Sequence, residues 1–83
     1  MEYYVITFES THAAITIERS LKKKFKITIL PTPREISHGC GIAIRFSTED
    51  FDAIKEQLQS FPIDEKMYSI YQFTKGEYKQ ITW

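Results

Sequence analysis

The sequence predicts an α+β fold in which two helices are inserted between the strands of an antiparallel sheet. Runs of β-branched and aromatic residues of strand length recur along the chain. Two segments between them instead place apolar residues three and four positions apart, as amphipathic helices do. In chain order these segments give β-α-β-β-α-β followed by a short hairpin strand, which is the split βαβ pattern of a ferredoxin-like sandwich.

The first half of the chain supplies a strand, a helix and a second strand. Tyr3 to Phe8 is the first apolar run, and Ser10 or Thr11 can cap the helix that follows. We expect this helix to end near Lys24, because basic residues suit the negative C-terminal end of a helix. The segment 25–30, "FKITIL", alternates as a strand and is ended by prolines. The apolar stripe of the helix is formed by Ala14, Ile17 and Leu21.

The second half repeats the alternation of strand and helix. Ile42 to Phe46 is predicted as the third strand, and Ser47 or Thr48 as the cap of a second helix. Met67 to Phe73 is predicted as the fourth strand. A Lys-Gly turn at 75–76 then leads into a short fifth strand, Tyr78 to Trp83. The apolar stripe of the second helix is formed by Phe51, Ile54, Leu58 and Phe61.

Length and composition restrict the class of protein. At 83 residues the chain has room for one core, so we expect a single domain over residues 1–83. Eleven basic residues balance eleven acidic ones, which gives no support for binding nucleic acid or a membrane through bulk charge. The start, "MEYYVITFES", has no basic segment before a long apolar stretch, and a single cysteine cannot form an internal disulfide. We therefore expect a cytoplasmic protein.

The one cysteine, Cys40, has unusual neighbours. Gly39 and Gly41 flank it, and these are two of only three glycines in the chain. His38 and Arg34 precede it closely. Glycine on both sides lets the backbone turn sharply and leaves the sulfur open to another molecule. We therefore predict that Cys40 is a reactive thiol in an exposed loop.

The predicted topology brings a helix N-terminus to this loop. In a split βαβ sheet, the turn after the first strand and the loop between the second and third strands lie at the same end. Ser10, Thr11 and His12 should therefore approach the loop that carries Arg34, His38 and Cys40. Free amide groups at a helix N-terminus and nearby cations stabilise a thiolate, lowering the thiol pKa from its usual value of about 8.5.

Other interpretations of these residues stay open. Cys40 can instead be a small buried apolar residue, as free cysteines often are. Cys40, His38 and His12 can be metal ligands, but the spacing is weak and we expect no metal site. His12 can be an ordinary first-turn residue, and His38 a solvated loop residue. Arg34 can form a surface ion pair with Glu35.

The sequence lacks the common signatures of cofactor-dependent enzymes. It contains no P-loop, dinucleotide-binding fingerprint or G-x-S-x-G elbow, so we expect no cofactor. A single thiol also has no resolving partner in its own chain, which favours chemistry completed by a second molecule. These observations favour a carrier over a turnover enzyme.

Three segments of the chain resemble a known family. "YVITFESTHAAITIE", "ILPTPREIS" and "CGIAIRF" are similar to a small bacterial domain family described as selenium/sulfur (Se/S) carrier protein-like, over about residues 3–61. The resemblance implies that Cys40 holds sulfur or selenium as a persulfide or selenosulfide, received from a donor protein and passed to an acceptor protein. It also implies that His12, Pro33, Arg34 and Gly41 surround the thiol.

Two competing functions follow from the predicted sheet. The far face should carry some of Tyr3, Tyr68, Tyr71 and Arg45, and an exposed aromatic surface is typical of a protein-interaction or ligand-regulated module, including a homodimer. Ferredoxin-like sheets also bind RNA by stacking bases on aromatic residues. The zero net charge disfavours RNA, and we expect no nucleic-acid partner.

Overall fold

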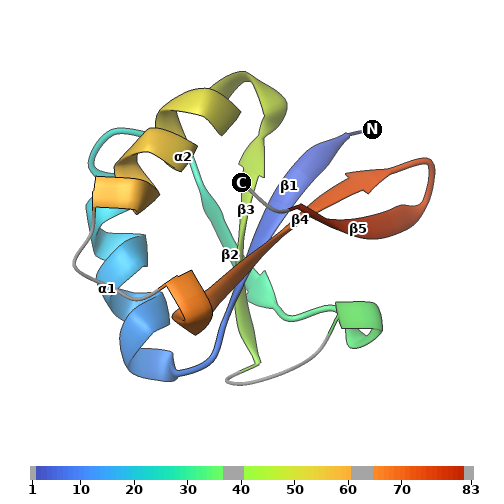
Figure 1. Ribbon diagram of the computed structural model, residues 1–83, viewed down its shortest axis with the longest axis horizontal. Helices are drawn as coiled ribbons and strands as arrows, with labels where there is room; N and C mark the ends of the chain where they lie inside the picture. The colour runs from blue at the N-terminus through green and yellow to red at the C-terminus, as the bar shows by residue number, and fades with distance from the viewer. Residues whose placement is uncertain (1, 37–40, 61–64, 82–83) are drawn as a thin grey trace.

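The computed structural model describes residues 2–36, 41–60 and 65–81. Its elements occur in the predicted order (Figure 1). The strands and helices are β1 (Tyr3–Phe8), α1 (Thr11–Lys22), β2 (Thr28–Pro31), β3 (Ile42–Ser47), α2 (Phe51–Ser60), β4 (Tyr68–Thr74) and β5 (Glu77–Ile81). Three single 3₁₀ turns accompany them: η1 (Arg34–Ile36), η2 (Thr48–Asp50) and η3 (Glu65–Met67).

The strands form one antiparallel sheet in the order β2-β3-β1-β4-β5. Both helices lie on the same face of this sheet, while η1 lies on the other side (Figure 1). The central strand β1 pairs with β3 and with β4, strands that follow it far along the chain. This is the predicted ferredoxin-like α+β arrangement, extended by the hairpin strand β5.

The main core fills the space between the sheet and the two helices. Alternate residues of a strand point to opposite faces, so every second residue of β1, β3 and β4 enters this core. The helices add the apolar stripes that their spacing predicts. The buried residues of this core are Ile6, Phe8, Ala13, Ala14, Ile17, Leu21, Ile44, Phe46, Ile54, Leu58, Tyr68 and Ile70.

The opposite face of the sheet, which we call the open face, is only partly covered. Ile36 of η1 is buried on it, against Val5, Ala43 and Tyr71. Tyr3, Leu30 and Tyr78 pack at the margin of this second, smaller cluster. No helix lies over the rest of this face in the described part of the chain (Figure 1).

Two predicted boundaries are wrong around the end of the first helix. α1 ends at Lys22, not Lys24, and β2 begins at Thr28, not Phe25. The backbone amides of Lys24 and Phe25 both donate to the carbonyl of Leu21, at 3.1 and 2.8 Å. These bonds close the helix C-terminus, so Phe25 belongs to the helix end although its side chain fits the alternating pattern of the strand.

The far face was expected to carry some of Tyr3, Tyr68, Tyr71 and Arg45. It carries Tyr3, Tyr71 and Arg45, whereas Tyr68 is buried beneath the helices, on the other face from Tyr71. The two residues are three positions apart on β4, and a regular strand turns such residues to opposite faces. Phe61, predicted in the stripe of the second helix, and Trp83, predicted in the last strand, lie outside the described residues.

Candidate functional site

The strand register places the two predicted turns at one end of the sheet. Thr7 at the end of β1 pairs with Ala43 near the start of β3, and Pro31 at the end of β2 pairs with Ile42. The backbone amide of Thr32 then donates to the carbonyl of Gly41, at 3.0 Å. The start of α1 and the connection between β2 and β3 therefore lie at the same end, as the topology predicts.

Ser10 is the cap of α1. Its backbone is extended (φ −141°, ψ 154°) and its Oγ accepts a hydrogen bond from the amide of Ala13 at 3.1 Å. Thr11 is the first helical residue and is exposed. The amides of Thr11 and His12 have no acceptor among the residues that the structure describes. The first turn also contains no acidic side chain, so its positive end is available to an anion.

His12 is exposed in this first turn. Its backbone carbonyl accepts a hydrogen bond from Thr16 Oγ1 at 2.9 Å, which is a contact within the helix. The imidazole is therefore on the surface, at the end of the helix nearest the connection between β2 and β3. This position is compatible both with an ordinary first-turn residue and with a proton carrier.

The backbone conformation at position 41 favours glycine. Its φ is +69°, in the left-handed region that other residues enter only with strain. A Cβ atom at this position would meet no heavy atom within 4 Å, so crowding is not the cause. Gly41 therefore has a backbone conformation that glycine adopts without strain.

A buried hydroxyl lies next to the same turn. Thr32 Oγ1 has essentially no solvent contact and no hydrogen-bond partner among the described residues. Buried hydroxyl groups are nearly always paired in folded proteins, so a hydroxyl with no partner among the described residues is unusual. Thr32 could not be identified from the sequence, because a threonine between two prolines carries no signal of burial.

Arg34 is part of η1, on the open face of the sheet. Pro33 starts a 3₁₀ turn in which the Ile36 amide donates to the Pro33 carbonyl at 3.1 Å. Ile36 anchors this turn on the open face, and α1 covers the other face (Figure 1). Arg34 and Glu35 are both exposed there. Arg34 and His12 therefore start from opposite faces of the sheet, which differs from the expected grouping.

The remaining predicted site residues, His38, Gly39 and Cys40, lie outside the described residues. Over residues 2–36, 41–60 and 65–81, no three His, Cys, Asp or Glu side chains form a group able to hold a metal ion. Within the same ranges, no helix is long and apolar enough to cross a membrane.

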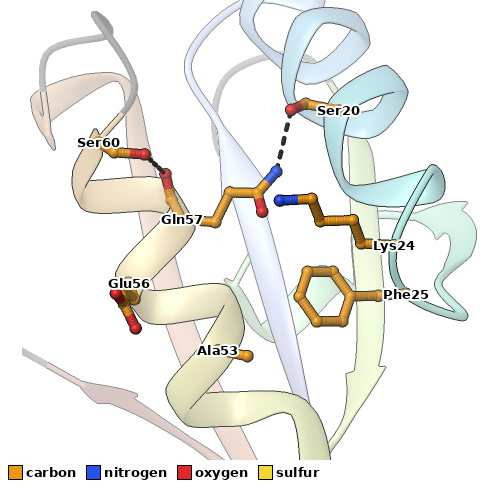
Figure 2. Close-up of a pocket in the computed structure, with 7 residues that line it drawn as sticks. All are labelled: Ser20, Lys24, Phe25, Ala53, Glu56, Gln57 and Ser60. Atoms are coloured by element: carbon orange, nitrogen blue, oxygen red, sulfur yellow. Dashed lines mark hydrogen bonds between the residues drawn. The ribbon is translucent and has the colours of Figure 1, made fainter.

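A groove lies between the two helices on the helical side of the sheet. Its volume is about 720 Å³, and Figure 2 shows Gln57 of α2 reaching across to Ser20 of α1. The Gln57 amide nitrogen donates to Ser20 Oγ at 3.1 Å. The groove opens beside the C-terminal half of α1, away from His12. Its lining residues are Ser20, Lys24, Phe25, Ala53, Glu56, Gln57 and Ser60.

Comparison with known proteins agrees with the resemblance noted in the sequence. The chain is 41% identical over 56 residues to an uncharacterized protein of Methanocaldococcus jannaschii, MJ0011. That match covers 68% of this chain but only 28% of the relative. No solved structure matches the chain.

A family model also matches residues 3–69, a range that runs from the start of β1 into β4 and includes the cysteine. The match therefore covers β1, β2, β3, both helices and the start of β4, and most of the chain. The protein belongs to the family described as "Putative Se/S carrier protein-like".

Proposed function

We propose that this protein carries sulfur or selenium as a terminal atom on Cys40. Membership of the Se/S carrier-like family is the observation that carries the proposal. The end of the sheet that holds Gly41 supports it, because the N-terminus of α1 and the buried Thr32 hydroxyl lie there. Among the described residues, two amides of that helix and this hydroxyl have no hydrogen-bond partner. Groups of this kind stabilise an anion, and the working form of a thiol carrier is a thiolate or a persulfide anion.

The transfer step is an exchange between two sulfur atoms. The Cys40 thiolate attacks the terminal sulfur of a persulfide on a donor protein, and a new S–S bond forms on Cys40. The S–S bond of the donor breaks, and the donor thiolate leaves. The donor is reduced to its thiol while Cys40 is oxidised to the persulfide, so no external oxidant is needed. A second thiolate, on the acceptor protein, removes the terminal atom by the same step.

Each predicted residue has a role in this scheme. Ser10 and Thr11 form the start of α1, whose free amides would stabilise the anion. His12 or His38 would accept the proton of the thiol, and Gly39 and Gly41 would keep the sulfur accessible. Because η1 lies on the open face, we assign Arg34 to contact with a partner protein instead of the anion.

Persulfide loading tests the proposal directly. The protein is incubated with a persulfide donor and its intact mass is measured; we expect the wild type to gain one sulfur atom that a reductant removes. The chain has one cysteine, so the Cys40→Ser variant should gain none. Circular dichroism of the variant shows whether it is folded. Equal labelling of the wild type and of folded Cys40→Ser would refute the carrier function.

The second candidate is a protein-interaction module. The observation that favours it is the row of aromatic rings on the open face, where the Tyr3 and Phe73 rings stack with centroids 4.8 Å apart and Tyr78 follows at 4.7 Å from Phe73. Sedimentation would then detect a stable homodimer or complex that alkylation of the thiol leaves intact. Loss of assembly on alkylation would favour the carrier.

A further inference from the structure

A second hollow lies at the other end of the sheet from Gly41. Its volume is about 230 Å³, and it opens beside the starts of β1 and β2 and the end of β3. Both of the cationic residues that line it come from the β2 and β3 side of the sheet. The lining residues are Glu2, Tyr3, Lys26, Thr28, Arg45, Phe46 and Ser47. We call this hollow the basic pocket.

The strand register gathers hydrogen-bond donors around the basic pocket. Thr28 pairs with Arg45, and Tyr3 pairs with Ser47, so the side chains of these four residues share the open face. Lys26 precedes Thr28 by two residues and lines the same hollow. Two cations and three hydroxyl groups, those of Tyr3, Thr28 and Ser47, therefore line one small volume.

Arg45 is held in place by the aromatic row. Its guanidinium carbon lies 5.3 Å from the centre of the Tyr3 ring, which is a cation–π contact. Tyr3 in turn stacks on Phe73, and its hydroxyl lies 3.4 Å from the hydroxyl of Tyr78. These contacts restrict the Arg45 side chain before a ligand binds. Binding therefore causes a smaller loss of side-chain conformational entropy.

The cations of the basic pocket lack an acidic partner. Among the residues that the structure describes, neither Lys26 nor Arg45 has a carboxylate within ion-pair distance. Glu2 is the acidic residue in the lining, and it accepts a hydrogen bond from Thr74 Oγ1 at 2.6 Å. Thr74 is on β4, on the opposite side of β1 from β3. This bond ties one oxygen of the Glu2 carboxylate to β4, on the side of β1 away from the strands that carry the two cations.

We propose that the basic pocket binds the phosphate group of a small organic phosphate. Two unpaired cations match the charge of a phosphate monoester, which approaches two at neutral pH, and phosphate oxygens accept from arginine, lysine and hydroxyl donors together. Ser47 Oγ accepts from the amide of Glu49 at 3.0 Å, which leaves its own hydrogen free to donate. The volume fits one anionic group, and the organic part would extend along the open face.

Nucleic acid is a poorer source of this phosphate. A polymer is bound by many phosphate contacts along a basic track, whereas this chain has zero net charge and the basic pocket has two cations. A small molecule needs one such site only. This function is separate from sulfur transfer, because the pocket is at the other end of the sheet.

The test is a titration of the ¹⁵N-labelled protein followed by amide chemical shifts. Inorganic phosphate and adenosine monophosphate should both shift the amides around Lys26, Thr28, Arg45 and Ser47 with a saturable curve at millimolar concentrations. Acetate should bind more weakly. Lys26→Ala and Arg45→Gln should each weaken phosphate binding about three- to tenfold, as expected for exposed charged contacts. Arg19→Gln, which changes an exposed arginine on α1, should leave it unchanged.

The same spectra show whether each variant is folded, and Thr28→Val provides a third change if Arg45→Gln is not. Absence of saturable shifts in the wild type would overturn the proposal, as would equal binding by the wild type and folded Lys26→Ala. Binding of single-stranded RNA without binding of adenosine monophosphate would overturn the assignment to a small molecule. Sulfur loading of Lys26→Ala should remain complete, so failure of one proposal can be told from failure of the other.

Discussion

Ser10 sets the start of α1 through a single hydrogen bond. Its Oγ satisfies the amide of Ala13, one of the donors that the first turn cannot pair internally. We expect Ser10→Ala to lower the free energy of unfolding by about 1 kcal/mol, measured by urea denaturation. Thr11→Ala is the matched control, since Thr11 is exposed and is not the cap; it should change the stability by less than about 0.5 kcal/mol. Equal effects of both variants would show that the cap does not control this helix.

Single residues also show why the site was only partly predictable. The sequence indicated that Gly41 allows a turn, and its positive φ agrees. It did not indicate that Arg34 lies away from α1, because a connection between two strands can fold over either face. The deciding residue is Ile36, an apolar side chain in a polar segment, which gains stability by burial on the open face. An isolated isoleucine in a polar segment was the one feature of the sequence that could have indicated this placement of Arg34.

At the scale of elements, the β4–β5 hairpin depends on two residues in the left-handed region. Lys75 has a φ of 53° and Gly76 a φ of 78°, and Thr74 pairs with Glu77 across this two-residue turn. Positive φ at both positions is the signature of a type I′ turn, whose twist matches the strands. The sequence predicted this turn from Lys-Gly alone.

We expect Gly76→Ala to destabilise the protein by about 1 kcal/mol, because alanine enters this backbone region only with strain. Crowding does not contribute, since a Cβ atom there would meet nothing within 4 Å. Lys75→Gly should stabilise the protein, because it removes the backbone strain already present at Lys75. Thermal and urea unfolding of the two variants measure both signs. Destabilisation by Lys75→Gly as large as that by Gly76→Ala would contradict this account.

Periodicity predicted the elements better than their ends. The stripes of α1 and α2 and the alternation in β1 and β3 come from burial on one side, which leaves a pattern in the sequence. The boundary between α1 and β2 depends instead on backbone hydrogen bonds to the Leu21 carbonyl, and these leave no pattern. Its predicted position was therefore wrong although both elements are present.

At the scale of the molecule, the two faces of the sheet have different chemistry. The two helices pack on one face and form an apolar core with it. The other face carries aromatic rings, Arg45 and the η1 turn. Gly41 and the start of α1 lie at one end of this sheet, and the basic pocket lies at the other end. The two proposed functions therefore use separate parts of the molecule and can be tested independently.

The aromatic row on the open face should make the stability of the whole molecule depend on alkaline pH. Burial, then the hydrogen bond to Tyr3, then the nearby charges of Tyr3 and Glu35, raise the pKa of Tyr78 from 10.0 to about 12. Burial and then Glu9 raise the pKa of Tyr71 as well. A raised pKa means that the folded protein holds the phenol proton more tightly than the unfolded chain does. The contribution of Tyr78 to the free energy of unfolding is therefore fully present below pH 10. It is lost as the pH rises from 10 towards 12.

We expect the urea midpoint of the wild type to fall through this window more steeply than that of Tyr78→Phe, which has no phenol at this position. The other side chains are the same in both proteins, so the difference between the two curves reports Tyr78. Tyr78→Phe keeps the ring that packs on Phe73 and loses only the hydroxyl. Parallel curves would mean that the Tyr78 hydroxyl is as well solvated in the folded protein as in the unfolded chain, and that the open face does not bury it.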